Sequence, residues 1–178
     1  MTCTHPDVAY ALEVTSRYQA NPGEEHWKVV KTILKYLRRT KDQFLIYEDS
    51  ELKLEGYTDA SFSSDRDDSK SISGYVFTLN SGAVSWKSSK QATVADSITE
   101  AEYIAASEAA KEAVWMKKFL AELGVVPLIE GAVPLLDVEI QKVDGKENAA
   151  DPFTKALGAK DFDKHKWKLG MKYKSDWL

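Results

Sequence analysis

The strongest constraint on the fold is a set of strand-forming segments that leads directly into one long helix. Leu52 to Thr58 reads as a strand that stops at Asp59 and enters a polar loop. Gly74 to Leu79 and Ala83 to Lys87 are rich in β-branched and aromatic residues, and Asn80-Ser81-Gly82 separates them. A short connection that contains glycine is typical of a hairpin. The pattern therefore predicts an antiparallel, three-stranded meander.

The long helical pattern that begins at Ser97 carries two acids in its first turns. Ser97 and Glu100 match the S-x-x-E capping box, which favours a structural role for Glu100. Glu102 instead aligns with the apolar stripe of the helix, which comprises Ala105, Ala106, Ala109, Ala113, Met116, Leu120 and Leu123. An acid on a buried stripe is costly without a partner, and a metal ion is one such partner. The alternative is an acid stabilised by the helix dipole.

The predicted elements bring carboxylates together from separate parts of the chain. Asp59 ends the first strand and Glu102 lies at the start of the long helix. Oxygen ligands of this kind are what Mg²⁺ and Mn²⁺ prefer. The sequence therefore predicts a divalent-metal site where that strand and that helix meet.

The N-terminal part of the chain predicts two helices and a short strand. The helices are expected over Pro6 to Tyr18 and Glu24 to Leu37, and Asn21-Pro22-Gly23 separates them. The strand is expected at Phe44 to Tyr47. With the meander and the long helix, these segments define an α+β chain with an N-terminal helical segment.

The C-terminal part predicts two more strands and a short helix. The strands are expected at Val133 to Leu136 and Val138 to Val143, and Asn148 is expected to cap a helix from Ala149 to Leu157. Asp151 is at the third position after this cap, where capping and metal binding are both possible. The basic and aromatic tail from Lys160 to Lys174 suits either a nucleic-acid backbone or an exposed amphipathic helix.

Composition indicates an ordinary globular chain. The 178 residues are 43% hydrophobic and 29% charged, and the net charge of −4 requires that any nucleic-acid binding use local basic patches. The single cysteine, Cys3, cannot form an intrachain disulfide, which favours an intracellular setting in the cytoplasm or nucleus. No apolar run approaches the roughly 20 residues of a membrane helix, so no membrane partner is expected.

Several sequence blocks, in order, carry a resemblance to a known family. The blocks are Tyr57-Thr58-Asp59-Ala60, Arg66 to Ser71, Ser73 to Phe77, Ser85 to Ser88, Thr99 to Ala105 and Ala150 to Lys155. Together they resemble the ribonuclease H domain of copia-type LTR retrotransposon Pol polyproteins. Residues 1–50 resemble the end of the reverse transcriptase that precedes this domain, and residues 51–178 resemble the ribonuclease H-like domain itself.

The resemblance implies a fold, an activity and a set of site residues. The fold would be ribonuclease H-like, with a mixed sheet, and the activity would be metal-dependent hydrolysis of the RNA strand of RNA/DNA hybrids. Asp59, Glu102 and Asp151 would be the catalytic carboxylates that bind two Mg²⁺ or Mn²⁺ ions. Nucleic acid, as a hybrid or in another form, would be the partner, contacted by Lys87, Lys90 and Lys155.

One part of the family pattern is absent, near residues 134–138. There Val133 to Leu136 runs directly into Asp137, where the family has a further aspartate ligand followed by two helices. Asp137 and Glu100 are the alternative ligands, but Asp137 corresponds better to the start of the last strand. Parallel strands also need a crossover of a dozen or more residues, which this junction lacks. We therefore expect a truncated fold with weak or lost activity. The alternatives are a non-catalytic nucleic-acid- or protein-binding module and a structural domain whose carboxylates are caps.

Overall fold

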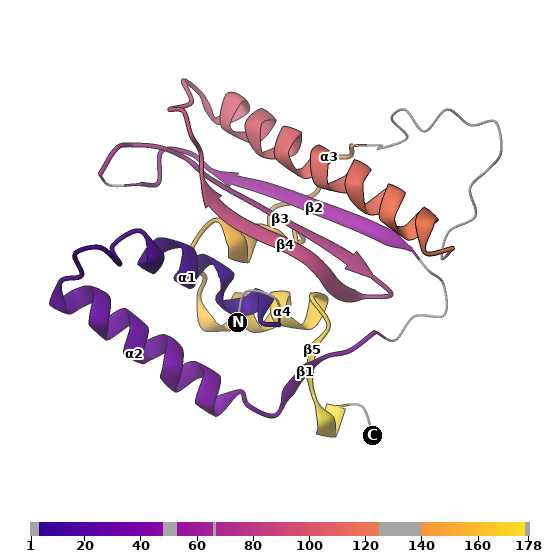
Figure 1. Cartoon of the computed structure of the whole chain (residues 1–178), viewed down its shortest axis with the longest axis horizontal. Helices are drawn as coiled ribbons and strands as arrows, with labels where there is room; N and C mark the ends of the chain where they lie inside the picture. Colours follow the sequence, from indigo (N-terminus) through magenta and orange to yellow (C-terminus); the bar gives the residue numbers. More distant parts are fainter. Residues whose placement is uncertain (1–3, 48–52, 66, 125–139, 177–178) are drawn as a thin grey trace.

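The computed structural model describes residues 4–47, 53–65, 67–124 and 140–176. A three-stranded sheet lies at the centre, with the long helix α3 across one face (Figure 1). Helices α1 and α4 lie on the other side of this sheet, and α2 lies beyond them. The chain is therefore α+β, as its sequence predicts.

The central sheet is the predicted antiparallel meander. It consists of β2 (Leu54–Ser61), β3 (Ile72–Leu79) and β4 (Gly82–Lys90), in that spatial order. Asn80 and Ser81 form the hairpin between β3 and β4, both with positive φ. Two left-handed residues match the right-handed twist of the strands they join, and asparagine tolerates that conformation well. The strand β3 is buried on both faces because it has a neighbour on each side and helices above and below.

The strand β2 continues further than predicted. It runs to Ser61, and Asp59 pairs with Gly74 inside the ladder. The expectation that the strand stops at Asp59 is therefore wrong. Thr58, Asp59 and Ala60 form a regular extended segment, so the Asp59 carboxylate projects from a strand and not from a loop.

The helix α3 (Ile98–Glu122) buries the predicted stripe along most of its length. Its buried residues are Ala101, Ala105, Ala109, Ala113, Met116 and Leu120. Ala109, Ala113 and Met116 pack with Phe77 of β3, which forms a hydrophobic cluster on this face of the sheet. Leu123 does not belong to the stripe, because it follows the last residue of the helix and is 58% exposed.

The opposite face of the sheet carries the second hydrophobic cluster. Val76 and Phe153 are fully buried there, together with Leu169 and Met171. Phe153 belongs to η2 (Asp151–Phe153), a single turn of 3₁₀-helix, and Leu169 follows α4 (Ala159–Lys168). The predicted helix from Ala149 to Leu157 is therefore wrong in length. Its central turn packs against the sheet, and the chain then bends away.

A second, two-stranded sheet joins the segment after α2 to the C-terminal part of the described chain. The strand β1 (Gln43–Leu45) pairs antiparallel with β5 (Met171–Tyr173), which leads into η3 (Lys174–Asp176). Before β1 come η1 (Pro6–Val8), α1 (Ala9–Ser16) and α2 (Glu24–Arg39), close to the predicted helices. Residues on both sides of position 50 thus share one hydrogen-bonded sheet.

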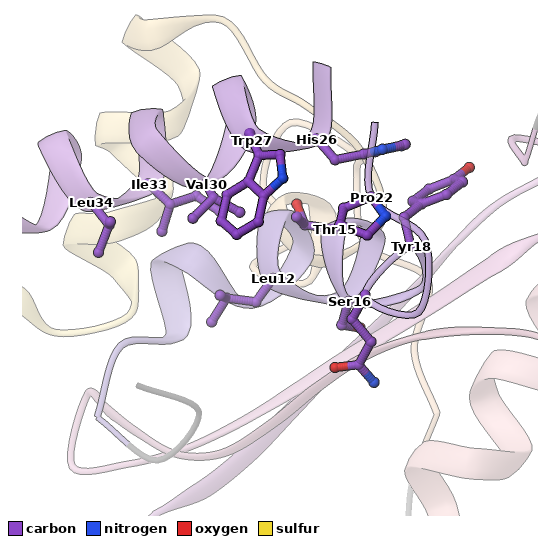
Figure 2. A pocket seen from close by; sticks show the side chains of 11 residues that line it. Leu12, Thr15, Ser16, Tyr18, Pro22, His26, Trp27, Val30, Ile33 and Leu34 are labelled. Carbon is purple, nitrogen blue, oxygen red and sulfur yellow. The ribbon is translucent and has the colours of Figure 1, made fainter. Parts of the chain in front are cut away.

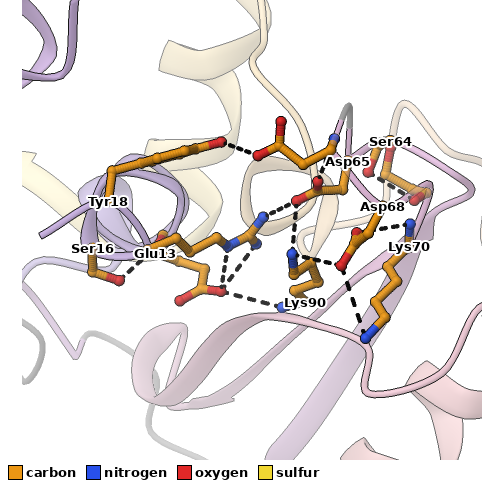
Figure 3. Close-up of polar contacts among 11 residues, drawn as sticks. Glu13, Ser16, Tyr18, Ser64, Asp65, Asp68, Lys70 and Lys90 are labelled. Carbon is orange, nitrogen blue, oxygen red and sulfur yellow. Dashed lines mark hydrogen bonds and ion pairs between the residues drawn. The ribbon is translucent and has the colours of Figure 1, made fainter. Parts of the chain in front are cut away.

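A network of charged residues fastens α1 to the central sheet (Figure 3). We call it the ion-pair network, and its members are Glu13, Arg17, Asp65, Asp68 and Lys90. Arg17 lies between Glu13 at 3.0 Å and Asp65 at 2.5 Å, and Lys90 lies between Asp65 at 3.4 Å and Asp68 at 2.9 Å. The network joins α1, the loop after β2 and the end of β4.

The remaining sequence predictions concern the segment between α3 and η2. Residues 140–143 contain no strand, so the described part of the expected strand from Val138 to Val143 is wrong. Val133 to Leu136, Asp137 and the truncation near 134–138 lie outside the described residues. Both described sheets are antiparallel, so the parallel component of the expected mixed sheet is not found in that part of the chain.

Candidate active site

The strand β2 presents Asp59 on the face of the sheet that η2 covers. The hydroxyl of Thr154, a fully buried residue just after η2, donates a hydrogen bond to the Asp59 carboxylate. This bond joins two residues 95 positions apart in the chain. The position of Asp59 relative to η2 is therefore fixed by a direct side-chain contact.

Gly74 allows η2 to approach the sheet this closely. A Cβ atom at this position would lie 2.6 Å from the Cβ of Phe153 and 2.9 Å from the Cγ2 of Thr154. Gly74 is the residue paired with Asp59 in the neighbouring strand. The absence of a side chain there brings Asp151 and Thr154 next to Asp59.

Asn148 connects the same two elements by its amide. Its Nδ2 donates to the carbonyl of Thr58 at 2.8 Å, and its Oδ1 accepts from the N–H of Ala150 at 3.0 Å. The predicted helix cap is therefore a tether between β2 and the turn before η2. Asp151 is not engaged in capping, since its carboxylate faces Lys155.

The helix α3 supplies the third carboxylate, Glu102. Ser97 is the N-cap of this helix, and its hydroxyl accepts from the N–H of Glu100 at 3.1 Å, as predicted. Glu100 Oε2 accepts from the N–H of Asp96 at 2.7 Å and not from Ser97. Glu100 therefore has a structural role at the helix start, whereas Glu102, two residues on, is half-buried beside β2 and interacts with Asp59.

Gln91 fixes the start of α3 against the sheet. It is 1% exposed, and its Nε2 donates to Ser73 Oγ at 2.8 Å and to the carbonyl of Ala101 at 2.9 Å. Ala101 immediately precedes Glu102. Sequence reasoning missed Gln91 and the role of the Thr154 hydroxyl, because a single polar residue after a strand gives no periodic signal.

The three carboxylates of Asp59, Glu102 and Asp151, here called the acidic cluster, therefore come together from three separate elements. Burial raises the pKa of Asp59, and the charge of Asp151 adds to this effect, although the Thr154 hydroxyl and Lys155 oppose it. Burial and the charge of Asp59 raise the pKa of Glu102, while the N–H of Ala60 and Lys155 oppose the shift. The cluster holds more negative charge than its surroundings compensate.

Lys155 is the cation that faces the acidic cluster. Its Nζ lies 2.6 Å from Oδ1 of Asp151, and its side chain is 47% exposed. Burial alone would lower the pKa of Lys155, but the hydrogen bond to Asp151 and the charges of Asp59, Asp151 and Glu102 raise it above its ordinary value. The ammonium therefore interacts with all three carboxylates.

The donor chemistry of the acidic cluster suits a hard divalent cation, but its geometry does not. Within the described ranges, no three His, Cys, Asp or Glu side chains come close enough to hold one metal ion. The cluster as arranged does not fit the metal pair that the resemblance implies, and an ammonium group faces the three carboxylates.

The lysines predicted to contact nucleic acid each have a carboxylate partner. Lys87 pairs with Glu108 at 3.3 Å, Lys90 belongs to the ion-pair network, and Lys155 pairs with Asp151. In the basic tail, Lys164 and Lys168 both contact Glu147. Binding of a phosphate by any of these lysines would have to replace an ion pair.

Two cavities in the described chain lie away from the acidic cluster. An apolar groove of about 300 Å³ runs between α1 and α2, where Leu12, Trp27, Val30, Ile33 and Leu34 line it (Figure 2). A larger cavity of about 510 Å³ lies between β2 and the alanine-rich side of α3. Neither is lined by a residue of the acidic cluster, so neither is a candidate for hydrolytic chemistry. None of the helices among the described residues combines the length and the apolar character needed to cross a membrane.

The fold and the site together define an α+β chain with an acidic cluster on its central sheet. Several known proteins are similar to this chain in sequence. The retrovirus-related Pol polyprotein from transposon TNT 1-94 of Nicotiana tabacum is 54% identical over 125 residues, which are 70% of this chain and 9% of the polyprotein. The corresponding polyprotein from transposon RE2 of Arabidopsis thaliana is 37% identical over 123 residues, 68% of this chain and 8% of its own length. The chain thus spans less than a tenth of these polyproteins.

A shorter relative matches over most of its length. Secreted RxLR effector protein 161 of Plasmopara viticola is 46% identical over 117 residues, 65% of this chain and 82% of that protein. The chain belongs to the family that these sequences form, which includes the retrovirus-related Pol polyproteins of transposons. No family model matches the chain, and no solved structure matches it.

Proposed function

We propose that this chain is the end of the reverse transcriptase and the ribonuclease H-like portion of a copia-type retrotransposon Pol polyprotein, with hydrolytic activity that is weak or lost. The observation that carries the proposal is the convergence of Asp59, Glu102 and Asp151 from β2, α3 and η2. The pKa values of Asp59 and Glu102 are raised. Partly buried carboxylates with perturbed pKa values that come from separate elements are typical of a functional site.

The relatives support the origin of the chain, and the site supports the loss of activity. Within the matched regions, Pol polyproteins of transposons from two plants are identical to this chain at more than a third of the positions. Hydrolysis of an RNA strand in this family would be expected to use Mg²⁺ or Mn²⁺ held by the three carboxylates. A cluster that no metal fits as arranged, and that an ammonium group neutralises in part, would hydrolyse poorly.

A non-catalytic module that binds nucleic acid is the second candidate. Lys155 favours it, because an ammonium group half exposed beside the acidic cluster lowers the repulsion that a phosphate would meet there. Such binding would weaken as salt rises, since phosphate contacts release counterions.

Cleavage of a labelled RNA strand in an RNA/DNA hybrid tests the proposal. The wild-type chain and Asp59→Asn would be compared in Mg²⁺ and in Mn²⁺, after circular dichroism shows both to be folded. We expect little or no cleavage by either protein. Robust cleavage that Asp59→Asn abolishes would contradict the loss of activity, and fluorescence anisotropy with the same hybrid would separate a binding module from a chain that does not bind.

A further inference from the structure

We propose that Lys155 is an internal counter-ion that excludes divalent cations from the acidic cluster. The inference deepens the proposed function, because it concerns the same site and gives a cause for the weak or lost hydrolysis. It does not depend on any measured cleavage.

Lys155 forms an ion pair with Asp151, a carboxylate that is almost fully buried. Asp151 is 7% exposed, and its Oδ1 atom lies 2.6 Å from Nζ of Lys155. A carboxylate buried to this degree needs a compensating charge. A divalent cation that used Asp151 as a ligand would have to displace this ammonium group or accept its repulsion.

The local backbone keeps Lys155 at the cluster. Its neighbour Thr154 is fully buried and donates one hydrogen bond to Asp59, and the η2 turn packs on Gly74. Lys155 therefore follows a residue that is fixed against the sheet. Its stem begins within the site, although 47% of the side chain is exposed to solvent.

The balance of charge explains why one ammonium group is sufficient. Lys155 interacts with Asp59 and Glu102 as well as with Asp151, and these interactions favour its charged form. The two other carboxylates already resist ionisation because they are partly buried and close to each other. With Lys155 present, the cluster attracts a further cation less strongly. Without it, the carboxylates lose this counter-charge, so Mg²⁺ or Mn²⁺ should be attracted to them more strongly.

The test measures metal binding directly in the full chain. Mn²⁺ binding would be followed by calorimetry and by the loss of the free Mn²⁺ electron paramagnetic resonance signal, for wild type, Lys155→Met and Lys155→Arg. Methionine removes the charge and retains a long aliphatic stem, whereas arginine retains the charge. We expect Lys155→Met to bind Mn²⁺ at least about tenfold more tightly than wild type, and Lys155→Arg to resemble wild type.

A matched lysine and a double variant complete the design. Lys87 is 48% exposed and paired with Glu108, so it has nearly the same exposure and the same kind of partner as Lys155. Lys87→Met should leave Mn²⁺ affinity unchanged, and adding Asp59→Asn to Lys155→Met should remove the gain. Mn²⁺ should also raise the melting temperature of Lys155→Met and leave that of wild type unchanged, a readout that shows the variant is folded.

The outcomes separate this inference from the proposed function. Equal Mn²⁺ affinity of wild type and Lys155→Met, or an equal gain in Lys87→Met, would overturn the role of Lys155. Tighter Mn²⁺ binding by Lys155→Met supports the inference whether or not that variant cleaves a hybrid. Strong cleavage by the wild-type chain would instead contradict the loss of activity in the proposed function, and the binding experiment would still decide the role of Lys155.

Discussion

The acidic cluster and the ion-pair network each contain three carboxylates, but they differ in how far neighbouring cations compensate the negative charge. Both gather three carboxylates around the central sheet. In the network, Arg17 and Lys90 lie between the acids, and each of the three carboxylates has at least one cation within 3.0 Å. Among the described residues that contact the acidic cluster, Lys155 is the one cation.

The pKa values of the acids reflect this difference. Asp65 of the network is buried, which by itself would raise its pKa, but the N–H of Asp67 and the charges of Lys90 and Arg17 lower it below its ordinary value. The pKa values of Asp59 and Glu102 are raised. Carboxylates that are paired with cations stabilise a fold. An excess of negative charge costs stability, and such a cost is typical of functional sites. This contrast indicates a structural role for the network, and it supports the proposal that the cluster derives from a functional site.

The largest expected effect comes from removing the residue that holds η2 against the sheet. Phe153 is fully buried in the hydrophobic cluster below the acidic cluster. We expect Phe153→Ala to lower the free energy of unfolding by about 3–5 kcal/mol, since it leaves a cavity and frees η2. Urea denaturation measures this. Phe44→Ala is the control, because Phe44 is 51% exposed and should cost less than about 0.5 kcal/mol. Equal losses in the two variants would show that η2 is not anchored by Phe153.

The network should be the next most sensitive region. Arg17→Ala removes the cation between Glu13 and Asp65, and the Asp65 side chain is only 6% exposed. The expected loss is roughly 1.5–3 kcal/mol, the range for hydrogen bonds to charged groups. Lys28→Ala provides the matched control, because the pair of Lys28 with Glu25 is exposed and contributes about 0–1 kcal/mol. A loss for Arg17→Ala no larger than for Lys28→Ala would remove the distinction between the two pairs.

The meander and the long helix could be predicted from sequence because their signals are local and periodic. The β-branched and aromatic residues of β3, the turn at Asn80-Ser81 and the Ser97 cap are each signals that lie within a few positions of one another. The position of Glu102 could be predicted because the buried residues of α3 recur at helical spacing. Asp59, Glu102 and Asp151 were all placed in one site by the combination of these signals and the family blocks.

The long-range contacts of the site could not be predicted from sequence. The Thr154–Asp59 hydrogen bond, the closeness of η2 to Gly74 and the Gln91 bridge join residues from different elements. Lys155 was predicted as a nucleic-acid contact, which stays a prediction, and its pairing with Asp151 was not foreseen. A basic residue after an acidic one has no signature that distinguishes a counter-ion from a ligand for phosphate.

The opposite pKa shifts predict opposite effects of one substitution in the two regions. Asp59→Asn should stabilise the chain at pH 7 by about 0.5–2 kcal/mol, the usual gain when strain at a site is relieved. The folded pKa of Asp59 is raised, so its ionised form costs stability above that pKa, and the gain should shrink as pH falls toward the ordinary value of an aspartate.

Asp65→Asn should instead destabilise the chain at pH 7. The folded pKa of Asp65 is lowered, so its contribution to stability is complete above its unfolded pKa and is lost as pH falls through the folded value. Urea denaturation of both variants from pH 4 to pH 7 measures the two slopes. Shifts of the same sign at pH 7 would contradict the contrast between a strained cluster and a compensated network.

The smallest effect on stability is expected for Lys87, the lysine of an exposed ion pair. Lys87 and Glu108 are both substantially exposed, so Lys87→Ala should change the free energy of unfolding by less than about 0.5 kcal/mol. Lys90→Ala should cost more, because Lys90 neutralises the buried Asp65. If the chain binds an RNA/DNA hybrid, Lys87→Ala should also lower the salt slope of binding by about 1, the value for one lost phosphate contact. An unchanged slope would leave Lys87 as a partner of Glu108 alone, and the acidic cluster with Lys155 would become the first place to look for nucleic-acid contact.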